Sequence, residues 1–192
     1  MNEKELVLAA KSGDRAAFNE LISGYTDRIY RLAWKLSGNE EDAADIFQET
    51  FLKAVDNIDS FRLESSFGTW LYTIAMNVMR ACFAKRKRMQ LGPIEDYLPD
   101  HENGANSKLF DWGDPHDLFE NTQLREMIDS FLSRMSPENS TPFVLRYMED
   151  MPVKDIARIM DLSVPAVKSR ILRARLALRE HLTEKFREKK DG

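Results

Sequence analysis

Near its C-terminal end the chain carries four side chains whose types and spacing suit contact with DNA: Lys168, Ser169, Leu172 and Arg173. In a helix they share a face turned away from an apolar stripe, which is formed by Val167, Ile171, Ala174 and Leu178. A short helix that is braced on one side and offers Lys, Ser and Arg on the other fits a DNA major groove. The alternative is a helical hairpin whose basic face meets only solvent.

The elements that would position this face are two short helices within residues 151–180. The first has apolar residues at a helical period, namely Val153, Ile156, Ala157 and Met160. Ser163 can then cap the second helix, with Pro165 in its first turn. This pattern predicts a helix-turn-helix. Thr141-Pro142 is predicted to start the short helix that precedes it, and the tail from Glu184 is expected to fray in solvent.

A second candidate surface lies on a helix that is predicted to begin at Asn39. Its buried stripe is expected to comprise Ala43, Ile46, Phe47, Phe51, Ala54 and Val55. Its other face carries Asp45, Gln48, Glu49, Leu52 and Asp56. A carboxylate metal site is disfavoured because such helical sites add a histidine three residues after a glutamate. The face is either solvated or a protein-docking surface, and Leu52 among the acids favours docking.

A third candidate combines aromatic and basic residues around a helix predicted from about Phe67 to Arg88. Phe61, Phe67 and Trp70 precede a tract that includes Arg80, Lys85 and Arg86. Aromatic rings beside a basic tract can stack single-stranded bases while cations neutralise the backbone. Asn77 could read a base edge. The alternative is that Trp70 simply joins a helical core with Leu71, Ile74, Ala75, Val78 and Cys82.

The overall pattern predicts an all-α protein of two small helical domains joined by a flexible acidic linker, with the helix-turn-helix in the C-terminal domain. The predicted boundaries are 1–88 and 115–187 for the domains and 89–114 for the linker, with Asp114-Pro115 opening the second domain. Asn2 with Glu5 is expected to open a first helix. Asp14 is expected to open a longer one that continues to Gly38.

The charge of the chain is segregated. The 192 residues have a formal net charge of −4 and a pI near 5.5, which disfavours strong binding to DNA by the chain alone. Residues 80–88 hold five basic side chains and no acid, whereas residues 90–120 hold eight acids and a single Lys. This segregation indicates separate surfaces for separate partners. Cys82 is the only cysteine, and the sequence has neither signal-peptide order nor a membrane-spanning run, so we expect a cytoplasmic protein without membrane insertion.

Four stretches in this order resemble one family. They are SGDRAAFNELI, DAADIFQETFLKAVDNIDSF, FGTWLYTIAMNV and MPVKDIARIMDLSVPAVKSRILRARLALRE. Together they resemble the extracytoplasmic-function (ECF) sigma factors of bacterial RNA polymerase, within the sigma-70 superfamily. The resemblance implies a promoter-specificity subunit that is not an enzyme and needs no cofactor.

The resemblance also implies a role for each surface. Asp45, Gln48 and Glu49 would dock on the clamp of the largest polymerase subunit. The polymerase flap would be a further contact of the chain. Melted promoter DNA at the minus-ten element would meet Asn57, Phe61, Trp70, Ile74, Asn77, Arg80, Lys85 and Arg86, with one base flipped into a pocket. Duplex DNA at the minus-thirty-five element would meet Lys168, Ser169, Arg170, Leu172 and Arg173. An anti-sigma factor is the further partner implied, and the induced response would be a stress or envelope response.

Two other classes of protein compete with this interpretation. A free-standing helix-turn-helix regulator predicts a dimer and a palindromic footprint, although no dimer seam is as clear as the acidic face. A helical metalloenzyme is disfavoured because His101, His116 and His181 have no metal-ligand spacing to one another or to Cys82. Pro142 departs from the family pattern, in which this segment is a continuous helix, and predicts a shortened or kinked one.

Overall fold

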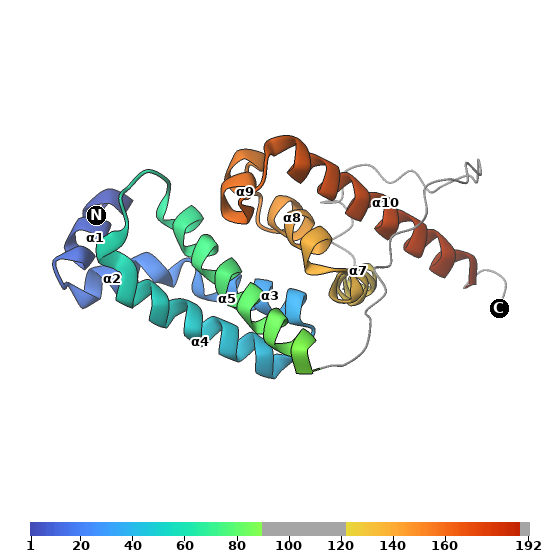
Figure 1. The fold of residues 1–192 in the computed structure, drawn as a ribbon, viewed down its shortest axis with the longest axis horizontal. Helices are drawn as coiled ribbons and strands as arrows, with labels where there is room; N and C mark the ends of the chain where they lie inside the picture. Colours follow the sequence, from blue (N-terminus) through green and yellow to red (C-terminus); the bar gives the residue numbers. More distant parts are fainter. Residues whose placement is uncertain (90–121, 189–192) are drawn as a thin grey trace. The chain divides into compact units, whose positions relative to one another are not determined.

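The computed structural model describes residues 1–89 and 122–188, and every element in these ranges is helical (Figure 1). The prediction of an all-α fold is therefore confirmed. The described helices belong to two compact units, which are considered separately below. The predicted linker and the predicted helix start at Asp114-Pro115 lie outside the described residues. None of the described helices is both long and apolar enough to cross a membrane.

The first unit contains five α-helices and a short 3-10 helix. They are α1 (Glu3–Lys11), α2 (Arg15–Ser23), α3 (Thr26–Ser37), α4 (Glu40–Asn57), η1 (Ile58–Ser60) and α5 (Phe67–Met89). Three of their starts are capped as predicted, because Asn2 and Glu5 form a capping box, Asp14 accepts from two backbone amides, and Asn39 accepts from that of Asp42.

The long helix predicted from Asp14 to Gly38 is wrong, because it breaks between α2 and α3. The chain turns at Gly24, and the amide of Tyr25 donates to the Ile22 carbonyl at 2.8 Å. The turn places the Tyr25 ring edge-on against two aromatic rings of α5, Phe67 at 5.8 Å and Tyr72 at 6.5 Å between centroids. Packing of one aromatic side chain against α5 therefore overrides the local helical period.

The core of the first unit lies where α4 packs against both α3 and α5 (Figure 1). Its fully buried side chains include Ile29, Leu32, Ile46, Leu71, Tyr72 and Met79. On α4 the predicted stripe is buried at Ala43, Ile46 and Ala54 and partly buried at Phe47 and Phe51. Val55 was expected in this stripe but is 52% exposed, because it lies one residue past the buried Ala54 and turns toward the groove described below.

The second unit contains α7 (Thr122–Arg134), α8 (Pro137–Tyr147), α10 (Val164–Glu188) and the first part of α9 (Val153–Met160). Helix α10 packs on α8 and α7 over a core that includes Ile128, Leu132, Phe143, Val144 and Leu145. Helix α10 also continues to Glu188, so the start of the tail is helical rather than frayed. Stacking of Phe131 on His181, with 4.7 Å between centroids, helps to hold this extension against α7.

Pro142 does not start a helix, contrary to prediction. It lies inside α8, which continues from Pro137 to Tyr147. Ser136 and Pro137 supply the real start. A proline inside a helix has no N–H for the carbonyl four residues earlier, which here belongs to Glu138. Arg170 of α10 replaces that donor, because its Nη1 lies 3.1 Å from the Glu138 carbonyl oxygen. A side chain of another helix thus satisfies the carbonyl that Pro142 leaves free.

Candidate functional site

The outer face of α10 presents the predicted DNA-facing side chains to solvent. Lys168, Ser169 and Arg173 are exposed, and Leu172 is 55% exposed. The opposite stripe of the same helix is buried, as predicted, at Val167, Ile171, Ala174 and Leu178. The hydroxyl of Ser163 accepts from the amide of Ala166 at the start of the helix. The arrangement leaves a basic face with one large apolar side chain available to a partner.

Arg170 is placed differently from the other members of the predicted DNA-facing set. Its guanidinium turns to α8, where it donates to the Glu138 carbonyl and lies 3.4 Å from the Glu138 carboxylate. The Arg170 side chain is 26% exposed, whereas that of Glu138 is 76% exposed. The bond to the carbonyl is the more important of the two, since an ion pair with an exposed carboxylate contributes little. In this structure Arg170 braces α10 instead of extending the basic face.

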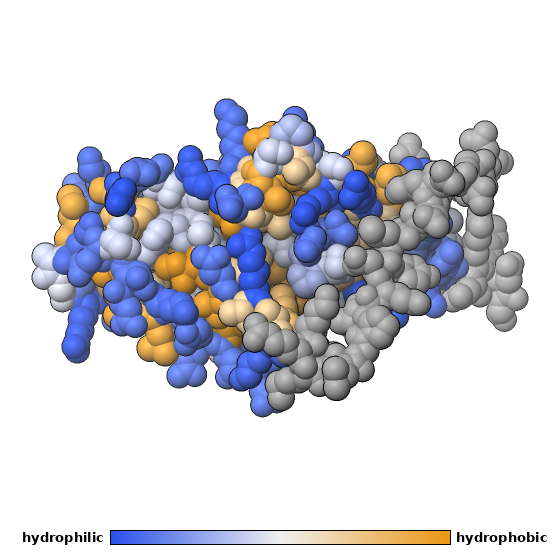
Figure 2. Space-filling model, in the orientation of Figure 1, coloured by the Kyte–Doolittle hydropathy of each residue, from blue (hydrophilic) through white to orange (hydrophobic). Residues whose placement is uncertain are grey.

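The polar face of α4 is exposed where docking was predicted. Asp45, Gln48 and Glu49 are all exposed. Nζ of Lys53, one helical turn further on, lies 3.2 Å from Oε1 of Glu49. Leu52, on the same face, is 52% exposed. Figure 2 shows apolar side chains interrupting the hydrophilic surface over α4. The face therefore combines acidic groups with exposed apolar area, as protein-binding surfaces do.

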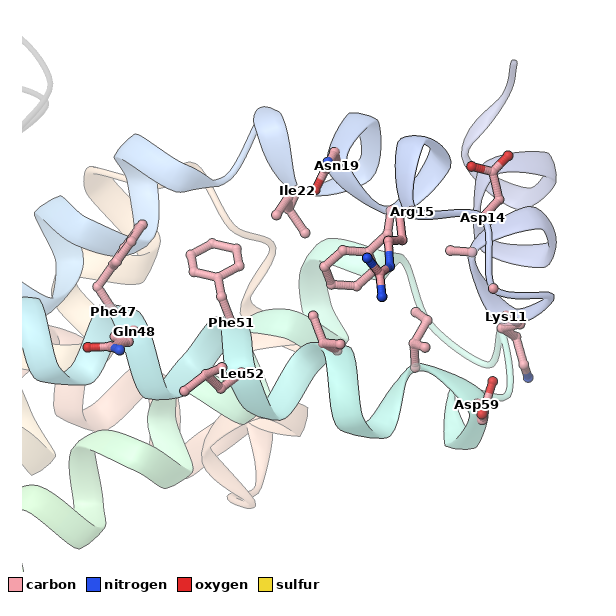
Figure 3. A pocket seen from close by; sticks show the side chains of 15 residues that line it. Lys11, Asp14, Arg15, Asn19, Ile22, Phe47, Gln48, Phe51, Leu52 and Asp59 are labelled. Carbon is pink, nitrogen blue, oxygen red and sulfur yellow. The ribbon is translucent and has the colours of Figure 1, made fainter.

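A groove of about 710 Å³ runs beside this face, between α4 and the α1–α2 segment. In Figure 3, Phe51 points from α4 toward Ile22 of α2, and Lys11, Asp14 and Arg15 lie toward one end of the groove. Gln48 and Leu52 belong to both the groove and the predicted docking face. Sequence reasoning missed the groove, because it requires α2 to lie across α4 and no pattern within one helix reveals that.

The aromatic residues before and within α5 form one cluster. Phe61 lies 5.1 Å from Trp70 and 6.1 Å from Phe67, and Phe67 lies 5.5 Å from Trp70, all between ring centroids. Phe61 is only 3% exposed and Phe67 is fully buried, whereas Trp70 is partly exposed. Phe61, which was predicted to meet a DNA base, therefore lies beneath Trp70 as a core residue in this structure.

The remaining predicted minus-ten residues lie at or near the surface. Asn77 is exposed, and its Oδ1 accepts from Nη1 of Arg80 at 3.1 Å. Ile74 is partly exposed, Lys85 is exposed, and the Arg86 side chain lies outside the described residues. Asn57 is exposed at the end of α4, where its side-chain amide donates to the Lys53 carbonyl.

The start of α5 is packed closely against Tyr25. A Cβ atom on Gly68 would lie 2.8 Å from both Cε1 and Oη of Tyr25, so the glycine allows this approach. Burial raises the pKa of the Tyr25 phenol, and the carboxylate of Glu3 in α1 raises it further. Tyr25, Gly68 and Glu3 thus converge on the N-terminal end of α5. Within residues 1–89 and 122–188 no group of His, Cys, Asp and Glu side chains is arranged to hold a metal ion.

Two family models match the chain, Sigma-70 region 2 at residues 21–89 and Sigma-70 region 4 at residues 125–178. Among curated proteins, the ECF RNA polymerase sigma factor SigW of Bacillus subtilis is 32% identical over 188 residues, covering 94% of this chain and 97% of that protein. The chain belongs to the ECF sigma factors of the sigma-70 family. As a sigma factor, it directs RNA polymerase to specific promoters for the initiation of transcription.

Further similarities agree with this membership. The ECF RNA polymerase sigma-E factor of Haemophilus influenzae is 35% identical over 177 residues, covering 91% of this chain and 92% of that protein. A solved structure of the sigma factor RpoE of Bartonella quintana, in complex with the anti-sigma factor NepR, shares the fold with a TM-score of 0.64. At 24% identity it covers 86% of this chain and 96% of that one. The region 2 match begins at residue 21, so α1 precedes it.

Proposed function

We propose that this sigma factor divides its work among three surfaces, and that the docking face of α4 makes the other two effective. Asp45, Gln48 and Glu49 would contact the clamp of the largest polymerase subunit. The adjoining groove and the exposed Leu52 would add apolar area to that contact. The observation that carries this proposal is the combination, on one helix, of exposed acids with exposed apolar side chains.

The second surface, at α5 and the loop before it, would receive the melted minus-ten strand. Trp70 and Ile74 are partly exposed beside the exposed Asn77, so an unstacked base can reach an aromatic ring, an aliphatic side chain and an amide together. Asn57 would contribute from the end of α4. Arg80, Lys85 and Arg86 would neutralise the strand backbone. Phe61 would contribute by supporting Trp70 from below.

The third surface, on α10, would read duplex DNA at the minus-thirty-five element. Lys168, Ser169 and Arg173 supply donors, and Leu172 supplies apolar contact. Arg170 would act here indirectly, by fixing α10 on α8. In this proposal residues 1–88 form the docking and melting domain, 115–187 form the duplex-reading domain held by the polymerase flap, and 89–114 form the linker.

Control by an anti-sigma factor is part of the same proposal. The fold neighbour from Bartonella quintana was solved with an anti-sigma factor bound, and the docking face and groove described here offer such a partner an exposed surface. Sequestration would keep the chain from polymerase until a stress or envelope signal releases it. Co-purification from the native host tests this, and recovery with polymerase alone under every stress would contradict it.

Run-off transcription tests the central proposal. Transcript starts mapped after overexpression supply a matched promoter, and transcription from it is measured with the purified chain, with core polymerase, and with both. We expect specific transcripts only when both are present. A chain that binds this promoter duplex tightly and specifically without polymerase would overturn the proposed division of labour.

A further inference from the structure

The loop between η1 and α5 is tied at both ends to α1. At one end, Nζ of Lys11 donates to the Phe61 carbonyl at 2.9 Å. At the other, the Phe67 amide donates to Oε1 of Glu3 at 3.1 Å. Both bonds are partly buried and each involves a charged side chain, so they are stronger than ordinary surface contacts.

Each tie is a hydrogen bond to a backbone group that has no partner within a helix. Phe67 is the first residue of α5, so its amide is one of the donors that a helix start leaves unpaired. The Glu3 carboxylate is also favoured there by the positive end of the helix dipole. The α1 helix thus fixes both the point where the loop leaves η1 and the point where α5 begins.

The loop between the ties is held in a strained conformation. Leu63 has a φ of 59°, in the left-handed region that residues with a Cβ atom rarely adopt. Such a residue persists only where its surroundings hold it in place. The ties at Phe61 and Phe67 fix the ends of the segment that contains it, and the same two residues carry rings that pack on Trp70.

We propose that α1 is a positioning element for the surface that receives the melted minus-ten strand, with Lys11 and Glu3 as its positioning residues. The proposal rests on the function proposed above. By fixing the loop and Trp70 before DNA arrives, α1 removes part of the ordering cost of binding. This assigns a role in promoter opening to a helix that lies before the matched region 2.

Four single variants test the two ties, two by removing a hydrogen bond and two by retaining it. Lys11→Met and Glu3→Ala each remove one tie, whereas Lys11→Arg retains a donor and Glu3→Gln retains an acceptor. Lys4→Met is the matched control, since Lys4 is an exposed lysine of the same helix. Each is assembled into holoenzyme with core polymerase, and thermal unfolding of each free chain checks that it folds.

Two affinities are then measured for each holoenzyme: that of the chain for core polymerase, and that of the holoenzyme for a labelled single-stranded minus-ten oligonucleotide from the mapped promoter. We expect Lys11→Met and Glu3→Ala to weaken oligonucleotide binding by about five- to tenfold and to slow open-complex formation. A loss of this size corresponds to the net contribution of one typical hydrogen bond. Lys11→Arg and Glu3→Gln should recover most of this loss. Lys4→Met should match wild type. The two Glu3 variants, whose residue does not line the groove, should bind core polymerase as wild type does.

Several outcomes would overturn the inference. Wild-type oligonucleotide binding by both Lys11→Met and Glu3→Ala would show that the ties do not prepare the surface. An equal loss with Lys4→Met would indicate general charge attraction. A loss of core affinity by the Glu3 variants that parallels their loss of oligonucleotide binding would show that α1 acts through docking instead. If the wild-type holoenzyme itself failed to bind the oligonucleotide or start transcripts, the proposed function would fail before the role of α1 was reached.

Discussion

Gly68 has no Cβ atom, and this allows Tyr25 to pack closely against the start of α5. A side chain there would come within 2.8 Å of the Tyr25 ring, and that ring also packs against Phe67 and Tyr72. The crowding atoms belong to a ring held among other aromatic rings, so they cannot simply move aside. The glycine is therefore required by packing at the start of α5.

We expect Gly68→Ala to lower the free energy of unfolding by about 1–3 kcal/mol, the usual cost of overpacking a core. Gly24→Ala is the matched control, because a Cβ atom at Gly24 would meet nothing within 4 Å and its φ of −75° suits any residue. Thermal or urea unfolding measures both variants. Equal stability of the two would contradict the packing explanation.

Arg170 and Pro142 are coupled through a single carbonyl group. Removing the arginine side chain leaves the Glu138 carbonyl without the donor that replaces the missing proline N–H. We expect Arg170→Met to lower the free energy of unfolding by about 0.5–1.5 kcal/mol, the net contribution of one solvent-exposed hydrogen bond. In a Pro142→Ala background the helix supplies its own N–H, so the same substitution should cost clearly less.

A double-mutant cycle with these variants measures that coupling, and minus-thirty-five affinity provides a second readout. If Arg170 compensates for the missing proline N–H, the stability lost with Arg170→Met should largely be recovered in the Pro142→Ala background, where the helix supplies its own donor. A loss of affinity without a matching loss of stability would instead make Arg170 a direct DNA contact. Arg173→Met is the reference for such a contact, since Arg173 is exposed on the outer face.

Within a single helix, periodicity predicted most of the buried face, with Val55 of α4 as an exception. The stripe of α10 that comprises Val167, Ile171, Ala174 and Leu178 is buried as predicted. The predicted caps form at Asn2, Asp14 and Asn39. These signals are local, because capping and amphipathicity depend on residues within a few turns.

The failures arise where a contact between helices decides the outcome. The break at Gly24 serves the packing of Tyr25 on α5, and the continuous α8 depends on Arg170 from α10. The groove needs α2 opposite α4, and Phe61 is buried because Trp70 covers it. None of these partners is visible from within the segment concerned, which is why sequence reasoning could place the surfaces but not their internal supports.

Charge reversal on helix α4 tests its predicted docking face. We expect the double variant Asp45→Lys and Glu49→Lys to weaken binding to core polymerase by at least about tenfold, since each reversed charge opposes a complementary surface. Glu49→Lys would also place two cations together at Lys53. Reversal of Glu180 and Glu184 on α10, which makes the same change in net charge, should leave core affinity nearly unchanged. Core binding measured by fluorescence titration decides between charge in general and this face in particular.

At the scale of the whole chain, net charge and function have to be reconciled. The basic face of α10 and the basic tract of α5 belong to a chain with a net charge of −4, and the acids of residues 90–120 oppose DNA. Phosphate neutralisation supplies most of the affinity of a protein for DNA, so this composition makes each DNA contact weak on its own. We therefore expect specific binding only when polymerase presents both surfaces at once.

The weakness of each DNA contact predicts a large difference in promoter affinity between the free chain and the holoenzyme. Linking two weak contacts raises the effective concentration of the second, so holoenzyme should bind the matched promoter at least about a hundredfold more tightly than the chain alone. Changing the spacing between the two promoter elements by half a helical turn should abolish most of that gain, because the contacts can no longer form together. Gel-shift titration of both spacings, at fixed salt and with or without core polymerase, measures the effect. Equal binding of the two spacings by holoenzyme would mean that one surface alone carries recognition, and that the acidic chain does not depend on simultaneous contact.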